Sequence, residues 1–545
     1  MSGAKTRLSS ARSLLNRAAA HLRQLALGAD GELDVHQLDT LQVPSYDLAW
    51  CAAELAAADA IQDYADRAAA DPLAQPLADA FAADVLQRCL ARWSARPAEF
   101  GLSLTDIFAL APANDSALCA AGASKTLASL GRELVLRRGA MPPALLGDDH
   151  ELMRDSFAKF AAESVAPRAQ AIHREDQDIP AELLREAASL GLFGVSIPER
   201  FGGMQPDGRG DTIAMLVVTE ALSHASLGAA GSLITRPEIM ARALLAGGTA
   251  AQQSRWLPAL AAGDKLCAIS ITEPDYGSDV ANLKFRGTRV ANGWQLDGAK
   301  TWCTFAARAD VLFVVTRTDP DPALSHKGLS VLLVEKPPFA GREFEYQSPL
   351  GGRLTGRAIA TLGYRGMHSY ELFFEGFVVP PDALIGESQG EGRGFYLTMT
   401  GMAGGRLQTA ARANGVMHAA IDAGIQYTSG RRVFGKTIAE YPLTSAQFAR
   451  MAAWLTASRQ FSYAVARRLD AGGDGREASL VKFFACRTAE WLTRDVMQMH
   501  GGMGYAEETL ASRLFVDARV LSIFEGAEET LALKVIARDL LARAS

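Results

Sequence analysis

Apolar residues recur every three or four positions in two long parts of the chain, before about residue 263 and after about residue 394. This spacing is typical of helices that bury one face. Between these parts the spacing becomes two, which is typical of β-strands, in CAISI, RGTRVANGWQLDGAKTW, VLFVVTRT, GLSVLLVEK and YELFFEGFVVP. Asn292-Gly293 predicts a hairpin turn inside the second of these segments. The pattern therefore predicts an α+β fold in which a β domain stands between helical parts.

The length of the chain exceeds that of one ordinary core, and we predict four domains. Residues 1–145 form a helical extension rich in alanine and leucine, which proline-containing breaks divide into about four or five helices. Residues 146–264 form a second helical domain, residues 265–390 the β domain, and residues 391–545 a four-helix bundle. The extension carries no pattern for a nucleophile, a metal site or a phosphate loop, so we expect it to act through packing. In the β domain, SPLGGRLTGRAIATLGYRG is expected to be a loop.

Composition narrows the classes of function. A net charge of −6, without a basic run beside aromatic residues, argues against nucleic acid as a partner. Six scattered cysteines form no CxxC pair, so neither a disulfide framework nor a metal site is expected. No apolar run reaches the about 20 residues needed to span a bilayer. We expect a bacterial cytoplasmic protein, although the first 29 residues are basic without an acid and also resemble a transit peptide.

Glu525 is the candidate base. It follows the largely apolar stretch Phe515 to Ile523, which delivers its carboxylate into water-poor surroundings, and it precedes a helical pattern. Gly526 lets the backbone come close to a ligand at the expected bend. The alternative is an ordinary acidic helix start, which the helix dipole favours.

Arg236 is the candidate anion-binding residue. It follows the apolar, glycine-bearing stretch LGAAGSLIT, and burying its charge there is unfavourable unless an anion meets it. The alternative is a surface arginine near a helix start.

Five segments, in order, resemble motifs of the acyl-CoA dehydrogenase family over roughly residues 148–543. They are ITEPDYGSD (271–279), TWCTF (301–305), RRVFGKTI (431–438), QMHGGMGY (498–505) and FEGAEET (524–530). The resemblance implies the fold of that family, with an N-terminal α domain, a central β domain and a C-terminal four-helix bundle, here preceded by an extra helical extension. It also implies FAD as cofactor, an acyl-CoA substrate and electron-transfer flavoprotein as electron acceptor.

The resemblance implies roles for individual residues. Glu525 removes the α-proton of the acyl-CoA, and the β-hydride passes to FAD. Residues expected to bind the cofactor are Ile269, Ile271, Thr272, Ser278, Trp302, Thr304, Arg431, Phe434, Gln498, Gly501 and Gly502. Residues expected to bind the substrate are Arg236, Ser278, Gly405, Arg406, Phe524 and Gly526. Gly405 stands where some relatives carry the base, while Ala527 and Glu529 replace a threonine and a glutamine common near the flavin.

Small residues at Ala403, Gly404 and Gly405 are expected to leave room for a branch at the α-carbon, and an arginine can hold a distal carboxylate. Both features favour a short branched dicarboxylyl-CoA. The long extension and several segments look like those of (2S)-methylsuccinyl-CoA dehydrogenases, which form mesaconyl-CoA in the ethylmalonyl-CoA pathway of acetate assimilation. A glutaryl-CoA or 2-methylacyl-CoA dehydrogenase, an acyl-CoA oxidase and a flavin-containing nucleic-acid-binding relative remain alternatives. We expect the extension to cover the bundle surface through which most relatives form tetramers, leaving a homodimer.

Overall fold

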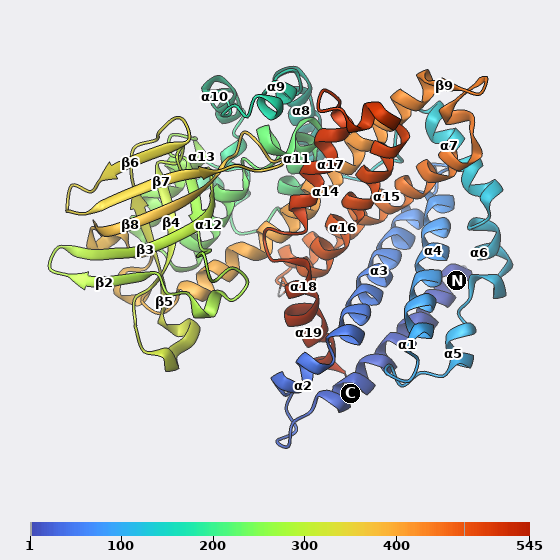
Figure 1. Cartoon of the computed structure of the whole chain (residues 1–545), viewed down its shortest axis with the longest axis horizontal. Coiled ribbons are helices and arrows are strands. Elements are labelled where there is room, and N and C mark those ends of the chain that lie inside the picture. The colour runs from blue at the N-terminus through green and yellow to red at the C-terminus, as the bar shows by residue number, and fades with distance from the viewer. Residues whose placement is uncertain (1–2, 474, 545) are drawn as a thin grey trace. The chain divides into compact units, whose positions relative to one another are not determined.

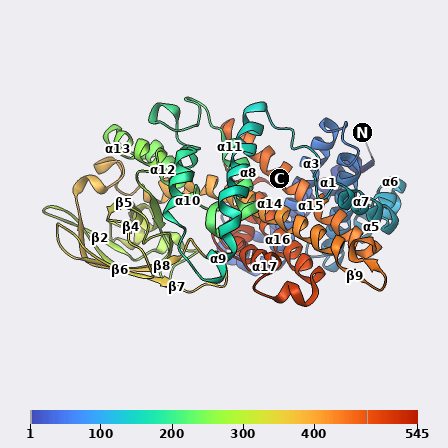
Figure 2. The ribbon, with the colours of Figure 1, turned by 90° about the horizontal axis from the view of Figure 1, so that it is seen from above.

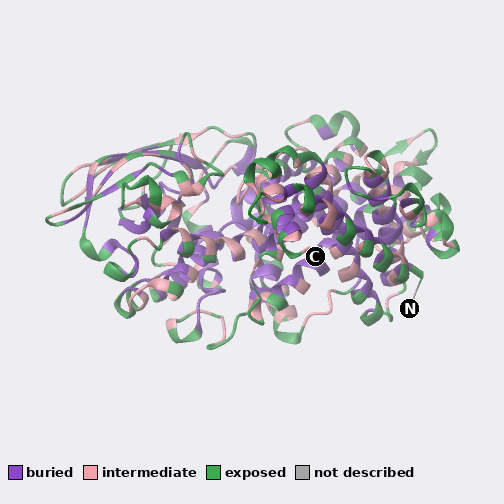
Figure 3. Cartoon of the chain, turned by 90° about the horizontal axis from the view of Figure 1, so that it is seen from below, coloured by how far each residue is buried: buried purple, intermediate pink, exposed green. Residues whose placement is uncertain are grey.

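The structure is a computed structural model that describes residues 3–473 and 475–544. It divides into two compact units. The bundle unit comprises Met1–Glu151, Thr409–Arg468 and Gly473–Ser545, and the sheet unit comprises Leu152–Gln408 and Leu469–Gly472. Figure 3 shows that buried residues concentrate inside the packed elements, whereas exposed residues mark loops and helix ends.

An eight-stranded sheet with the path β1-β4-β2-β3-β8-β7-β6, and with β5 paired to β4, forms the centre of the sheet unit (Figure 1). The strands are β1 Cys267–Ser270, β2 Arg286–Val290, β3 Gly293–Thr304, β4 Val311–Arg317, β5 Leu329–Glu335, β6 Glu343–Gln347, β7 Arg353–Ile359 and β8 Ser369–Val379. Its core is apolar and aromatic, with Trp294, Phe374 and Phe377 each 2% exposed. Large aromatic rings of this kind contribute much of the burial that stabilises a sheet.

The sheet unit also contains helices. They include α9 Ala166–Arg174, α10 Ala181–Ser189, α11 Thr212–Ala225, α12 Thr235–Gly247 and α13 Ala250–Ala261, while α8 Asp148–Phe160 begins in the bundle unit. Leu244 of α12 and Leu257 of α13 join Phe313 and Val331 of the strands in one buried cluster. A capping box between Thr249 and Gln252 defines the start of α13. Figure 2 shows α12 and α13 beside β4 and β5.

The bundle unit combines the N-terminal extension with the C-terminal helices (Figure 1). The extension consists of α1 Gly3–Ala26, α2 Val35–Thr40, α3 Gln42–Arg67, α4 Ala74–Ala95, α5 Leu104–Phe108, α6 Ser116–Ala121 and α7 Ser124–Leu136. The C-terminal helices are α14 Gly394–Gly430, which begins in the sheet unit, α15 Pro442–Asp470, α16 Glu477–Met499, α17 Leu510–Leu521, α18 Glu528–Thr530, the π-helix Leu531–Ala537 and α19 Arg538–Arg543.

Aromatic side chains pack the extension against the C-terminal helices. The ring of Trp50 on α3 lies 4.2 Å from that of Phe483 on α16, and Phe81 on α4 lies 5.1 Å from Trp454 on α15. The Trp454 indole also donates a hydrogen bond of 2.8 Å to Asp84. Aromatic pairs of this kind contribute about 0.5–1.5 kcal/mol each beyond their area burial. The packing role expected for the extension thus has specific partners on α15 and α16.

Three local expectations need correction. The segment expected to be a loop contains strand β7, and Arg353 on it pairs with Glu375 of β8. The hairpin turn lies one residue earlier than expected, because Val290 pairs with Gly293. Within the described part of the extension there are seven α-helices instead of four or five, since α2, α5 and α6 have only 6, 5 and 6 residues. Within residues 3–473 and 475–544, none of the helices combines the length and apolar character needed to cross a membrane.

Candidate active site

Glu525 lies in a tight bend between α17 and α18 of the bundle unit, as the sequence predicts. Its φ of 56° is in the left-handed region, and Gly526 follows with a φ of 99°. A left-handed conformation in a non-glycine residue costs about 1–3 kcal/mol and persists only where the surroundings hold it. A Cβ on Gly526 would lie 2.9 Å from the Leu531 side chain, so a glycine suits this position for both reasons.

Two cations hold the bend from the neighbouring helices. The Arg412 guanidinium on α14 lies 4.6 Å from the centre of the Phe524 ring, and its Nη2 lies 4.0 Å from Oε1 of Glu525. Lys482 on α16 donates to the carbonyl oxygen of Gly526 at 2.6 Å. The Glu525 side chain is 16% exposed and its pairing with Arg412 is long. Its carboxylate therefore has a nearby positive charge without a close, locking ion pair.

In the sheet unit, strand β3 presents an indole outward. The pairing of β3 with β8 shifts register between Lys300 and Cys303, and Trp302 at this bulge has a φ of 56°. Trp302 is 55% exposed. A bulge re-aims a side chain, and a large apolar ring held outward on a strained backbone is suited to cover a flat ligand. The hydroxyls of Thr304 and Ser369 pair beside it at 2.9 Å, and the Thr301 N–H donates to the Thr272 carbonyl at 2.9 Å.

A buried ion pair fixes the loop that carries Thr272 and Ser278. Lys300 is fully buried and donates to Oε1 of Glu273 at 3.0 Å and to the Ile271 carbonyl at 2.7 Å. The Glu273 carboxylate also accepts hydrogen bonds from the backbone N–H groups of Lys284 and Phe285, at 2.7 and 3.0 Å. Burial lowers the pKa of Lys300 to about 8, against the opposing effect of Glu273. The start of the loop is therefore tied to β3, and through Glu273 to the segment that precedes β2.

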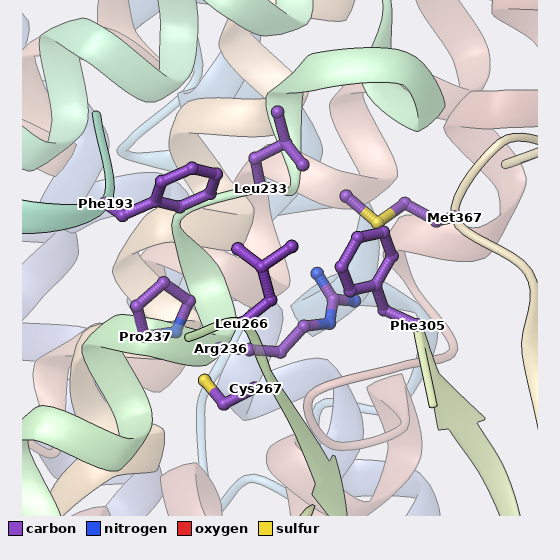
Figure 4. A pocket seen from close by; sticks show the side chains of 8 residues that line it. All are labelled: Phe193, Leu233, Arg236, Pro237, Leu266, Cys267, Phe305 and Met367. Carbon is purple, nitrogen blue, oxygen red and sulfur yellow. The ribbon is translucent and has the colours of Figure 1, made fainter. Parts of the chain in front are cut away.

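Arg236 lies in the first turn of α12 and lines a small apolar cavity of about 10 Å³, room for about one water molecule (Figure 4). It is 7% exposed and donates to the Ser232 carbonyl at 2.5 Å and to the Tyr364 hydroxyl at 3.0 Å. Figure 4 shows its guanidinium pointing toward Phe305 and Met367. Because Arg236 is buried, the alternative of a surface arginine is wrong, and among the described residues it forms no salt bridge. A buried guanidinium without a counter-charge is favourable for an anion.

The other cofactor candidates in the bundle unit are exposed. Phe434 is 97% exposed with a φ of 49°, at the tip of the hairpin formed by β9 Arg432–Val433 and β10 Lys436–Thr437. Arg431 and Gln498 are also exposed, and an added Cβ at Gly501 or Gly502 would meet open space. In the sheet unit, Ile269 and Ile271 are half-buried and Ser278 is exposed. Accessible donors, open backbone and flat rings fit a large planar and phosphorylated group such as FAD.

The glycines of α14 need a different explanation from the one the sequence suggested. A Cβ on Gly404 would lie 2.3 Å from Oε1 of Glu238 on α12. Glu238 is 2% exposed and pairs with Arg242 at 2.8 Å. The space beside Gly404 is thus filled by this ion pair, and the expectation that Gly404 leaves room for a branched substrate is wrong. Gly405 is buried and Arg406 is half-buried on the same helix.

Several residues beside the candidate groups escaped the sequence analysis. These residues contact partners in segments far apart in the chain; they are Tyr364, Ser369, Arg412 and Lys482. Only Tyr364 carried a local signal, since it lies in the glycine-flanked LGYRG. The roles of the predicted site residues stay predictions.

Three family descriptions match consecutive parts of the chain: acyl-CoA dehydrogenase N-terminal domain at residues 147–264, middle domain at 268–377 and C-terminal domain at 392–541. A (2S)-methylsuccinyl-CoA dehydrogenase of Cereibacter sphaeroides is 42% identical over 397 residues, 73% of this chain and 70% of that protein. A mitochondrial 2-methylacyl-CoA dehydrogenase of Solanum tuberosum is 34% identical, covering 73% of this chain and 91% of that protein.

Among solved structures, butyryl-CoA dehydrogenase of Megasphaera elsdenii matches with a TM-score of 0.66 and 28% identity, over 73% of this chain and 99% of that chain. Fold and matches together define an FAD-dependent oxidoreductase that acts on acyl-CoA. The chain belongs to the acyl-CoA dehydrogenase family, and its helical extension precedes the first matched residue, 147.

Proposed function

We propose that this acyl-CoA dehydrogenase oxidises (2S)-methylsuccinyl-CoA to mesaconyl-CoA in the ethylmalonyl-CoA pathway. The observation that carries the proposal is Arg236, a buried guanidinium that forms no salt bridge among the described residues. The similarity to a (2S)-methylsuccinyl-CoA dehydrogenase supports it. We also propose that the domain boundaries follow residues 145, 264 and 390.

Arg236 and Tyr364 would hold the distal carboxylate of the substrate. Arg236 lines the cavity and its guanidinium donates to the Tyr364 hydroxyl, and a hydrogen bond between charged groups contributes about 1.5–3 kcal/mol. The cavity of about 10 Å³ is smaller than a carboxylate, so the neighbouring Met367 has to shift. Methionine is suited to this because its unbranched side chain adapts easily.

Glu525 would remove the α-proton. Its strained bend fixes the carboxylate, and the Arg412 guanidinium lies 4.0 Å from it. The backbone N–H of Glu525 and the side chain of Phe524 lie in the same bend and would orient the thioester. FAD, when bound, supplies the acceptor for the β-hydride.

The cofactor would be held by two groups of residues. The group in the sheet unit consists of Trp302, the hydroxyls of Thr304, Thr272 and Ser278, and the side chains of Ile269 and Ile271. The exposed group of the bundle unit would reach the cofactor of a second copy. This group consists of Arg431, Phe434, Gln498, Gly501 and Gly502. This arrangement requires a homodimer, and electron-transfer flavoprotein would then reoxidise the flavin. We propose a cytoplasmic location.

The extension supports the dimeric state as a proposal. Trp50 and Phe81 occupy the faces of α16 and α15 that carry Phe483 and Trp454. A second dimer cannot use a surface that the chain covers itself. Light scattering at micromolar protein should therefore give the mass of a dimer, and a tetramer would contradict this part of the proposal.

The main test follows the bleaching of flavin absorbance near about 450 nm without oxygen. Wild type should bleach rapidly with (2S)-methylsuccinyl-CoA and more slowly with succinyl-CoA, because a missing methyl is worth about 1–3 kcal/mol. Arg236→Met should lose rapid bleaching, whereas the control Arg357→Met, which removes an exposed arginine of β7, should retain it. Bleaching by 2-methylbutyryl-CoA in place of (2S)-methylsuccinyl-CoA would contradict the dicarboxylate substrate and the role of Arg236. Peroxide formation without electron-transfer flavoprotein would favour an oxidase.

A further inference from the structure

The N-terminal extension contacts the segment that follows the candidate base. Tyr46, near the start of α3, donates a hydrogen bond from its hydroxyl to Oε1 of Glu528, the first residue of α18. Glu528 is 8% exposed. Figure 1 shows α3 beside α18 within the bundle unit. Burial, followed by the hydrogen bond to Glu528, raises the pKa of Tyr46 to about 12, so its hydroxyl stays a donor at neutral pH.

The Glu528 backbone closes the loop that carries Glu525. Its N–H donates to the Ser522 carbonyl at 3.1 Å, so the chain from 522 to 528 forms a closed turn with Glu525 near its middle. The positive φ values of Glu525 and Gly526 lie inside this turn. Strained backbone of this kind persists only where the flanking structure is fixed. The stem of the turn, where Ser522 and Glu528 meet, is therefore as important for the position of Glu525 as its tip, formed by Glu525 and Gly526.

Two anchors hold the turn, and aromatic packing joins them. Lys482 of α16 binds the Gly526 carbonyl at the tip, and Tyr46 of α3 binds the Glu528 side chain at the stem. Phe483, the residue after Lys482, packs against Tyr46 with ring centres 5.9 Å apart and planes at 87°. It also packs against Trp50. A displacement of α3 is thus transmitted to both anchors.

Further polar contacts join the extension to the chain beyond the turn. Asp39, at the end of α2, pairs with Lys534 at 2.8 Å, and Arg23 donates to the Leu541 carbonyl at 3.0 Å. The pair of Asp39 and Lys534 is exposed, and exposed ion pairs contribute little, whereas Arg23 binds a carbonyl of α19. Of these three residues of the extension, Tyr46 is the one whose partner belongs to the turn itself.

We propose that Tyr46 is a positioning residue for Glu525, and that the extension thereby serves the reaction as well as the fold. The proposal rests on the proposed role of Glu525 as base. Without the Tyr46 hydroxyl, the stem loosens, and Glu525 spends less time in the orientation needed to remove a proton.

Tyr64 supplies a matched control on the same helix. Its hydroxyl donates to the Pro143 carbonyl at 2.6 Å, and burial raises the pKa of Tyr64 to about 12. Tyr64→Phe therefore removes one buried hydroxyl from α3 without touching the turn, whereas Tyr46→Phe removes the anchor. Both variants keep the aromatic ring and its packing.

The first measurement is hydrogen exchange in the purified full-length protein, read over a peptide that covers residues 522–531. Tyr46→Phe should exchange about tenfold faster there than wild type, because local opening of the turn becomes easier. Tyr64→Phe should match wild type in the same peptide. This measurement does not depend on the substrate or on the identity of the base.

The second measurement is the rate of flavin reduction by the acyl-CoA substrate. Tyr46→Phe should reduce kcat about tenfold and leave KM within about twofold, since a misplaced base slows the chemical step without weakening binding. Glu528→Gln, which keeps an acceptor but removes its charge, should give an intermediate rate. Wild-type exchange in Tyr46→Phe overturns the proposal, and so does an equal loss of rate in Tyr64→Phe. Full activity in Glu525→Gln instead overturns the proposed base while leaving the exchange result intact.

Discussion

Lys336, which follows strand β5, gives a stability prediction whose size follows from its surroundings. Its side chain is 5% exposed, and its ammonium donates to the carbonyl oxygens of Ala307 and Ala309 at 2.8 and 2.6 Å. Burial lowers the pKa of Lys336 to about 7 from an ordinary value of 10.5. Between these two pH values the unfolded chain binds the proton and the folded chain does not. Stability from this group is therefore gained as pH rises from about 7 to 10.5 and is lost as pH falls again.

The magnitude follows from one proton, which changes the free energy of unfolding by about 1.4 kcal/mol per pH unit. From about pH 7, where the folded group is still half protonated, to about pH 9, the unfolding free energy of wild type should rise by about 2.3 kcal/mol relative to that of Lys336→Met, which has no titrating group at this position. Urea unfolding followed by tryptophan fluorescence at the two pH values measures this change. The control is Lys265→Met, which removes a 46% exposed ammonium from the sheet unit. A difference between Lys336→Met and wild type that stays constant over this range would refute the reasoning.

Three further predictions follow from the bundle unit. Glu525→Gln should abolish flavin bleaching by any acyl-CoA while the purified protein keeps its flavin absorbance, since only the proton acceptor is removed. Gly526→Ala should lower the free energy of unfolding by about 1–3 kcal/mol, because alanine is strained at a φ of 99°, and an unchanged melting temperature would contradict this. Glu54→Gln should lower the free energy of unfolding in urea by about 3 kcal/mol, since this fully buried carboxylate pairs with Arg88 and Arg92. The control Asp63→Asn, at a 76% exposed carboxylate, should lower it little by comparison.

The sequence predicted the order of helices and strands because long periodic segments carry that information locally. All five predicted strand segments contain strands, and the predicted bend at Glu525 and Gly526 is present. Strand β7 was missed because glycine and arginine interrupt its alternation, and pairing with β8 holds it in the sheet in spite of its composition. Strand β6 was missed although its short sequence EFEYQ alternates.

The candidate site could be predicted only in part, for a similar reason. A motif indicates which residue takes part in the reaction, but it does not indicate which distant side chain holds that residue in place. Neither the Tyr364 hydroxyl at Arg236 nor Lys482 at Gly526 has a local signal that names its partner. Gly404 was misread because a missing side chain in a sequence does not indicate whether substrate or protein fills the space; here Glu238 fills it.

The contact between Tyr46 and Glu528 joins residues 482 positions apart, which has a consequence for how the protein is made. Helix α3 is synthesised early, yet Trp50 and Tyr46 find their partners only after α16 and the last turn have left the ribosome. Until then an apolar face of the extension stays uncovered, a state that favours aggregation or capture by chaperones. Contacts so distant in sequence also form slowly. The turn that carries the candidate base can therefore gain its contact with Tyr46 only after both segments have been synthesised.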